Sequence, residues 1–287
     1  MARVTAAFSA LAANCLLVQS VPAQTSVPNE IDIAVGYTAE ALQAFGNDRA
    51  RLQAHLFAHR ERTNAMLQAS GAPVRLNLLA IELAADFRQT VFATDRRRFI
   101  EGSDGGEALE RLRDRSGADV RLLLVNYDGR GARVHYGGLF DPRRSRTAAL
   151  KNAYLMIGTN ADAMTFAHEI GHVLGCQHAR RRPCASGRGN GLSFGYGFLS
   201  EDGLGTIMAG ACATTEIVPL YSNPALSHRF RRAGAATERT VRLGSDTADC
   251  VRAMTNNARY LGGLNERISD PLGEALNSPI MADLIAD

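Results

Sequence analysis

Apolar and polar positions alternate with two different periods along the chain, and these periods predict strands and helices in turn. Residues 31–37 (IDIAVGY) and residues 74–83 (VRLNLLAIEL) alternate as β-strands do. Between them, residues 39–70 carry an apolar stripe at helical spacing, and Gly71 ends it. Residues 119–127 (DVRLLLVNY) are almost continuously apolar, which predicts a central strand covered on both faces.

Shorter elements complete this pattern. A helix over residues 161–174 is expected to begin at a cap formed by Asn160 or Asp162 and to end at Gly175. After Gly175 the chain is rich in Gly, Arg, Ser and Pro through residue 205, which predicts loops. Strands that alternate with helices predict an α/β layered domain around a mixed sheet. The other predicted elements are helices over residues 107–115 and 246–260, a strand over residues 153–157 and a short edge strand within residues 134–140.

Length and composition exclude some classes of function. A chain of 287 residues fits one or two domains with a substantial core. The formal net charge of +3 is too small to indicate a nucleic-acid partner. No segment beyond the N-terminal region is long and apolar enough to span a bilayer, so we expect no stable membrane anchor. Residues 263–287 form a mixed C-terminal tail, for which we expect poor order.

The N-terminus has the features of a signal peptide. Arg3 provides the positive start, and residues 6–18 form an apolar run that is too short to cross a membrane. Small side chains then precede a plausible cut between Ala23 and Gln24. Removal of residues 1–23 would make the protein secreted, either extracellular or periplasmic. A buried N-terminal helix is the alternative interpretation.

Four cysteines remain after this cut, at Cys176, Cys184, Cys212 and Cys250. An even number of cysteines in an exported chain indicates two disulfides, for which three pairings exist. The pairing Cys176–Cys184 with Cys212–Cys250 keeps both loops short and is the one we favour. Free buried thiols are the alternative.

Residues 168–178 read His-Glu-Ile-Gly-His-Val-Leu-Gly-Cys-Gln-His, which indicates a metal site. On a helix, residues four apart differ by only about 40° in direction, so His168 and His172 face one side and can bind one zinc ion. Glu169 points about 60° away from His172. This direction keeps the carboxylate out of the coordination plane but within reach of a water molecule on the metal, where it would act as general base.

The third histidine requires the helix to break. In a continuous helix His178 would lie about 240° around from His172 and about 9 Å further along the axis. Gly175 can adopt the left-handed conformation that turns the chain out of the helix. We therefore predict one catalytic zinc ion (Zn2+) on three histidines, with an open fourth position for water. Hydrolysis of peptide bonds is the expected reaction.

A second segment supports this site. Residues 205–208 read Gly-Thr-Ile-Met, and Met208 follows His178 by 30 residues. A methionine in such a turn would form an apolar floor beneath the histidines.

Together these segments resemble the metzincin zinc metalloproteases. The motif at residues 168–178, the turn at residues 205–208 and the sequence Tyr221-Ser222-Asn223-Pro224 are similar to the bacterial reprolysin-like enzymes. Among these, the chain looks most like the peptidyl-Asp metalloendopeptidases. Residues 116–127 and 246–258 share the likeness, which covers roughly residues 30–260.

This resemblance implies a secreted zinc endopeptidase that acts on proteins or peptides, with a catalytic domain at residues 24–262. Its mixed twisted sheet and helices would form an upper subdomain of about residues 30–175, with the zinc helix at a cleft. A small irregular lower subdomain of about residues 176–262 would end in a helix. The edge strand within residues 134–140 would bind substrate as an added β-strand, and the stretch Tyr221–Pro224, with Tyr221 as a substrate-binding residue, would wall the pocket beside the cut bond.

The chain departs from the family pattern at one position. Several relatives carry a tyrosine two residues after the turn methionine, where this chain has Gly210. A metal-binding or oxyanion role for that tyrosine is therefore absent, unless Tyr221 takes its place.

The resemblance also implies cleavage on the amino side of aspartate. Arginine binds carboxylates through paired hydrogen bonds, so the basic residues just past His178 are candidates for holding the acidic side chain. An exposed, solvated run of charge is the alternative. The candidates are Arg180, Arg181, Arg182 and Arg188.

Two further interpretations concern the same residue types. A catalytically inactive zinc domain that binds peptides or matrix is the rival function, although retention of Glu169 and an open zinc position argue against it. His55 and His59 also lie four residues apart on a predicted helix, but no glutamate follows His55. We expect them to form a surface pair on an amphipathic helix.

Overall fold

The computed structural model describes residues 29–127, 135–138, 141, 143–180, 192–212, 216–231, 234 and 236–265. The predicted signal segment and most of the C-terminal tail lie outside these residues. Within the described part of the chain, no helix combines the length and the apolar character needed to cross a membrane.

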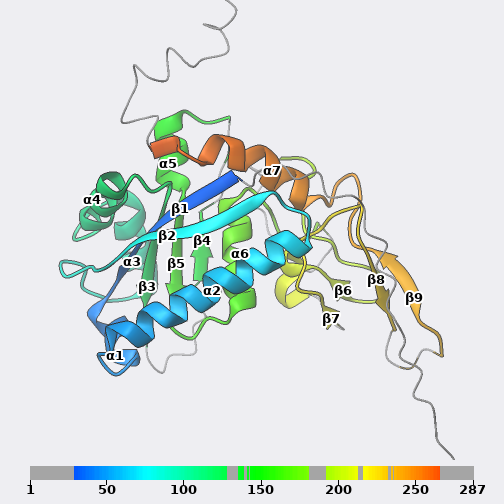
Figure 1. The fold of residues 1–287 in the computed structure, drawn as a ribbon, viewed down its shortest axis with the longest axis horizontal. Coiled ribbons are helices and arrows are strands. Elements are labelled where there is room, and N and C mark those ends of the chain that lie inside the picture. Colours follow the sequence, from blue (N-terminus) through cyan, green and yellow to red (C-terminus); the bar gives the residue numbers. More distant parts are fainter. Residues whose placement is uncertain are drawn as a thin grey trace, which may run out of the picture.

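A five-stranded sheet in the order β2-β1-β3-β5-β4 forms the centre of the fold (Figure 1). Its first four members in this order run parallel, and β4 is antiparallel to β5 at one edge. This arrangement confirms the predicted α/β class with a mixed sheet, and each strand lies where the sequence predicts one. The strands are β1 (Asn29–Tyr37), β2 (Val74–Leu83), β3 (Val120–Val125), β4 (His135–Gly137) and β5 (Tyr154–Gly158).

The helices differ from the prediction in three places. The single helix expected over residues 39–70 is two helices, because Gly46 and Asn47 have positive φ angles of 72° and 59° and turn the chain between them. Two short helices, α3 and α5, lie where no helix was expected. The helices are α1 (Ala39–Ala44), α2 (Arg49–Ala69), α3 (Phe92–Glu101), α4 (Glu107–Ser116), α5 (Arg146–Asn152), α6 (Ala163–Val173) and α7 (Cys250–Leu261).

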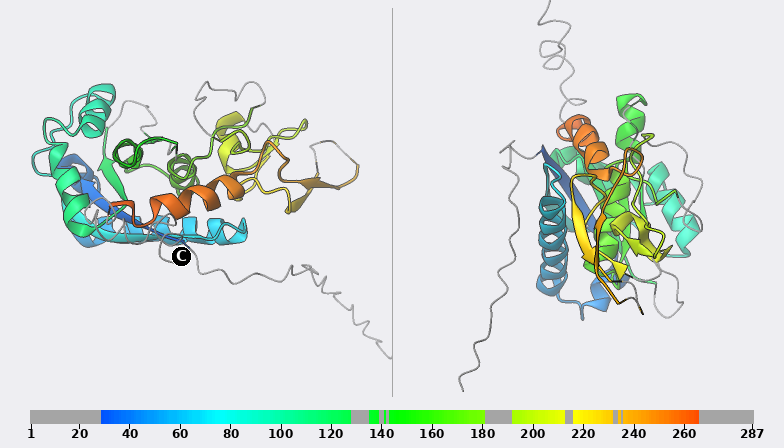
Figure 2. Two further views of the ribbon diagram at one scale, coloured as in Figure 1. Left: turned by 90° about the horizontal axis from the view of Figure 1, so that it is seen from above. Right: turned by 90° about the vertical axis from the view of Figure 1, so that its right-hand side faces the viewer.

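Helices cover both faces of the sheet (Figure 2). Along β3, Leu122 and Leu124 join the large core beneath α2, α6 and α7, whereas Leu123 and Val125 join a second core beneath α3 and α4. All six residues of β3 are buried, as expected for a central strand enclosed on both sides.

The chain beyond α6 forms a smaller, irregular part built on short strands. These elements are β6 (Leu204–Gly205), the 3-10 turn η1 (Ile207–Cys212), β7 (Glu216–Ile217), β8 (Ser227–Phe230) and β9 (Arg239–Arg242). Leu204, Val218, Phe230 and Leu243 give this part its own small core. Helix α7 then returns to the sheet, and Met254, Ala258 and Leu261 join the large core.

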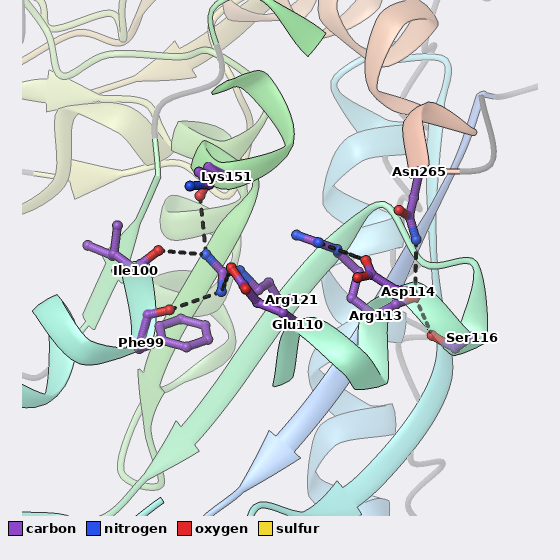
Figure 3. A network of polar contacts seen from close by, with 9 residues as sticks. All are labelled: Phe99, Ile100, Glu110, Arg113, Asp114, Ser116, Arg121, Lys151 and Asn265. Atoms are coloured by element: carbon purple, nitrogen blue, oxygen red, sulfur yellow. Dashed lines mark hydrogen bonds and ion pairs between the residues drawn. The ribbon is translucent and has the colours of Figure 1, made fainter. Parts of the chain in front are cut away.

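A buried arginine joins α3, α4 and the sheet on the second face (Figure 3). Arg121 on β3 is 0% exposed and pairs with Glu110 at 3.0 Å. It also donates to the carbonyl oxygens of Phe99 and Ile100, both at 3.0 Å, at the end of α3. Burial lowers the pKa of Arg121 to about 10, so the guanidinium remains charged at neutral pH.

We expect Arg121→Leu to lower the free energy of unfolding by about 3 kcal/mol, because a partly buried carboxylate and two helix-end carbonyls lose their donor. The matched control is Arg115→Ala, which removes an arginine that is 53% exposed and pairs with Glu82 on the surface. That control should cost less than about 1 kcal/mol in urea denaturation. Equal losses for the two variants would contradict the assigned role of Arg121.

Asp119, just before β3, is a second buried ionisable side chain. Its carboxylate accepts the backbone N–H groups of Asp32 and Leu264, at 3.1 and 2.9 Å. Burial raises the pKa of Asp119 to about 7, against the opposing effect of these hydrogen bonds.

This pKa predicts that stability decreases as pH rises. Between the ordinary value of 3.8 and about 7, the folded protein holds a proton on Asp119 that the unfolded chain has lost. The free energy of unfolding should therefore fall from pH 4 to pH 7, by up to about 4 kcal/mol, and this contribution should stay constant above that. Urea denaturation across this range should show the slope in the wild type and a flatter slope in Asp119→Asn. If the free energy of unfolding changes with pH in the same way in both proteins, the raised pKa of Asp119 is contradicted.

Candidate metal centre

Helix α6 carries the first part of the expected metal site. Asp162 caps it by accepting from the N–H of Thr165 at 2.7 Å, which selects one of the two expected caps. Most of the helix is buried, including Phe166, Ile170 and Val173, and it packs between α2, β4 and η1. A helix enclosed in this way holds its side chains in fixed directions.

The three histidines of the motif converge on one point. The Nε2 atom of His178 lies 3.0 Å from Nε2 of His168 and 3.1 Å from Nε2 of His172. A metal ion needs several histidine, cysteine or carboxylate side chains close together. Among the described residues, this is the one group of at least three such side chains that could hold an ion.

The helix breaks where the sequence predicts. Gly175 has φ +91°, and its N–H donates to the carbonyl of His172 at 2.9 Å. The chain then runs beside residues 195–197, where the N–H of Gln177 donates to the carbonyl of Gly195 at 2.8 Å. This backbone contact sets the position of His178.

Backbone carbonyls fix the protonation of two of the rings. Nδ1 of His168 lies 3.0 Å from the carbonyl oxygen of Ile207, and Nδ1 of His172 lies 2.8 Å from that of Cys176. A carbonyl can only accept, so both Nδ1 atoms carry a proton, and in the neutral rings the Nε2 atoms present lone pairs. Neutral rings that meet in this way can bind one cation through Nε2. Two ligands of a tetrahedral zinc ion lie about 3.3 Å apart, close to the spacing seen here.

Glu169 lies beside this point and is 8% exposed. Its Oε2 atom accepts the backbone N–H of Gly137, on edge strand β4, at 2.5 Å. A Cβ on Gly137 would stand 2.3 Å from the carbonyl oxygen of Glu169, so only glycine allows the strand to approach α6 this closely. The sequence does not reveal this donor, because a backbone N–H group is present at every non-proline position. Only the glycine at residue 137 marks the place.

Met208 and Tyr221 pack on α6 near the histidines. A Cβ on Gly171 would stand 2.4 Å from Sδ of Met208 and 3.2 Å from the Tyr221 ring. Tyr221 is 0% exposed, and its hydroxyl donates to the carbonyl of Ala167 at 2.6 Å. The Tyr221 side chain is therefore enclosed behind the helix, whereas Asn223 and Pro224 of the predicted pocket wall are partly exposed.

Of the four candidate arginines, the structure describes only Arg180. It is exposed, its guanidinium carbon lies 4.0 Å from the centre of the Tyr196 ring, and one of its nitrogens donates to the carbonyl of Ser193 at 3.0 Å. Arg181, Arg182 and Arg188 lie outside the described residues.

The other histidine pair was predicted wrongly. His59 is 7% exposed, and its ring packs edge-on against Phe166 of α6 at 5.6 Å. Its Nε2 contacts the carbonyl of Ala161 at 2.9 Å. Burial, and then the nearby His59 charge, lower the pKa of His55 to about 4. His59 faces α6 rather than the surface, because α2 packs directly on that helix, and His55 is half-buried between Phe45 and His59.

The favoured disulfides are also absent. Cys176 and Cys250 are free and buried, and each belongs to one of the two expected bonds. Cys184 and the side chain of Cys212 lie outside the described residues. Burial, and then a hydrogen bond to the Cys250 thiol, raise the pKa of Cys176 well above its ordinary value.

A family model described as metallo-peptidase family M12 matches residues 27–219, which include the three histidines and Glu169. The chain belongs to metallo-peptidase family M12. This result confirms the resemblance that the sequence shows.

Curated proteins similar to this chain include several peptidyl-Asp metalloendopeptidases. A peptidyl-Asp metalloendopeptidase of Pseudomonas aeruginosa is 28% identical over 258 residues, which cover 83% of this chain and 41% of the relative. A second one, of Stenotrophomonas maltophilia, is 28% identical and covers 82% of this chain and 52% of its own length. A third, of Xanthomonas campestris, is 27% identical, and the match covers 83% of this chain and 52% of the relative. The chain therefore spans about half the length of the curated relatives it matches.

A solved structure shares the fold of this M12 chain. It is titled "Structure of a chaperone-substrate complex" and superimposes with a TM-score of 0.61 at 20% identity, covering 84% of this chain and 36% of that one.

Proposed function

We propose that this protein is a secreted zinc-dependent endopeptidase. The observation that carries the proposal is the convergence of three Nε2 atoms beside Glu169, on a chain of the M12 family. The curated relatives are named metalloendopeptidases, which supports the same reaction here.

His168, His172 and His178 would hold the ion. When bound, zinc supplies a Lewis acid that polarises a peptide carbonyl and lowers the pKa of a water molecule. The Glu169 carboxylate takes a proton from that water and then gives it to the nitrogen of the leaving amine. The N–H of Gly137 holds one carboxylate oxygen, so the other oxygen is oriented for this transfer.

Strand β4 supports an extended substrate. It pairs with β5 on one side and forms the edge of the sheet on the other. A peptide added along this free edge would lie next to Gly137, and through it next to Glu169. The substrate is therefore proposed to bind as a further strand, with its scissile bond near the histidines.

An inactive peptide-binding zinc domain is the rival function, and a digestion experiment separates the two. The purified protein is incubated with an unfolded protein substrate, and the fragments are identified by N-terminal sequencing. We expect internal cleavage that stops after treatment with phenanthroline and returns on addition of zinc. Peptide binding without any cleavage by the zinc-loaded protein would reject the enzyme in favour of the binding domain.

Secretion rests on the N-terminal segment and has its own test. Expression of the full chain in a bacterial host should place the protein in the periplasm or medium, with a mature sequence that begins at Gln24. A product that stays in the cytoplasm and retains residues 1–23 would contradict the proposed secretion.

The Asp preference is proposed from the names of the relatives and from the arginines after His178. Each of the four is changed singly to glutamine. We expect at least one variant to lose about 30-fold in kcat/KM on a peptide with Asp after the cut bond, because a charged hydrogen bond to the carboxylate is lost. The matched peptide with Asn should be cleaved unchanged. An unaltered Asp-to-Asn ratio in all variants would end the proposal.

A further inference from the structure

Two buried cysteines meet next to the metal centre. The Sγ atom of Cys176 lies 3.6 Å from the carbonyl oxygen of Cys250, a residue 74 positions later in the chain. Both residues are 0% exposed. The contact joins the turn that follows α6 to the first turn of α7.

The backbone holds both cysteines in place. The N–H of Cys176 donates to the carbonyl of Gly171 at 2.8 Å, and the N–H of Cys250 donates to the hydroxyl of Ser222 at 2.9 Å. Ser222 in turn donates to the carbonyl of Tyr196 at 2.7 Å. The thiols therefore stay side by side whenever the protein is folded.

We propose that Cys176 and Cys250 form a structural disulfide in the mature protein. A low-molecular-weight disulfide is a sufficient oxidant while the chain folds, before the two thiols are enclosed. The Cys176 sulfur attacks it and releases one thiol, and the Cys250 sulfur then attacks the mixed disulfide and releases the second. The cysteine pair gives up two electrons and two protons, and the oxidant becomes two thiols.

The bond would act on the metal centre through the backbone, which is the part of the inference that rests on the proposed function. The carbonyl of Cys176 accepts from Nδ1 of His172 at 2.8 Å. A cross-link at Cys176 fixes that carbonyl and, through it, the direction of the His172 ring. It also closes a long loop, which restricts the unfolded chain.

A peptide map tests the pairing without any reference to zinc or proteolysis. The purified protein is reduced and unfolded, refolded with glutathione and glutathione disulfide, denatured in acid with a thiol-blocking reagent, and digested with trypsin. Cleavage at arginine and lysine places the four cysteines on four separate peptides, residues 152–180, 182–188, 189–229 and 243–252. We expect residues 152–180 to be cross-linked to residues 243–252. A cross-link from 152–180 to 182–188, or blocked free thiols on Cys176 and Cys250, would overturn the proposal.

A stability measurement gives a second readout. The variant Cys184→Ala/Cys212→Ala leaves Cys176 and Cys250 as the only thiols beyond residue 24. Addition of the reductant TCEP should lower its Tm by about 10 °C, the effect expected for opening a loop of this length. The variant that also carries Cys250→Ala should melt at the same temperature with and without TCEP. A Tm that does not respond to TCEP in the first variant would mean that the bond does not form.

Discussion

Glu169→Gln should reduce peptide hydrolysis by about 10³-fold or more while zinc remains bound. The substitution keeps the size of the side chain but removes the proposed general base, which would accept a proton from water and return it to the leaving amine. Because the carboxylate lies beside the histidines and not among the three converging nitrogens, the ligand set is unchanged. The measurement is kcat/KM on a fluorogenic peptide, together with zinc content determined by mass spectrometry.

The control for this variant is Glu61→Gln, on the surface of α2, where the side chain is 64% exposed. It should match the wild type in activity, zinc content and Tm. Hydrolysis by Glu169→Gln within tenfold of the wild type, with full zinc, would show that another group acts as base.

His178→Ala should lose both the metal and the activity. His168 and His172 would remain on one face of α6, but two neutral imidazoles leave the ion without its third protein ligand. We expect zinc content to fall from about one ion per chain to near zero after dialysis, and hydrolysis to fall by about 10³-fold or more.

His228→Ala is the matched control for this variant. His228 is 33% exposed in its side chain and pairs with Glu216 at 3.0 Å, away from the candidate ligands. It should keep its zinc and its activity. If His178→Ala retains a full equivalent of zinc at the same site, the assignment of the third ligand is wrong.

The sequence predicts the sheet and the convergence of the histidines because both depend on local rules. Alternation of side chains identifies β2 to the residue, and the requirement that His178 turn back identifies Gly175 as the point of the break. The same local rules fail for α3. Its Asp95 is buried and not exposed, because it accepts hydrogen bonds from Thr90 and Tyr127. A polar residue that is satisfied by distant partners cannot be distinguished from a surface residue in the sequence.

The parts of the site that the sequence misses are backbone groups and long-range contacts. The N–H of Gly137 and the carbonyl of Ile207 hold Glu169 and His168, yet neither depends on a side chain. The burial of Tyr221 arises from its position behind α6, which the fold decides. The Cys176–Cys250 contact joins segments too far apart for spacing to reveal it, since short loops favoured another pairing.

Helix α7 has a consequence for synthesis on the ribosome. The side chain of Asn257 on this helix donates to the carbonyl of Leu174 at 3.1 Å, at the point where α6 ends. The apolar face of α7 packs on β1, the first strand. The earliest and latest described elements are therefore neighbours in the finished fold (Figure 1). The histidines do not gain this support until α7 has left the exit tunnel, so a nascent chain should remain without hydrolytic activity until α7 has emerged.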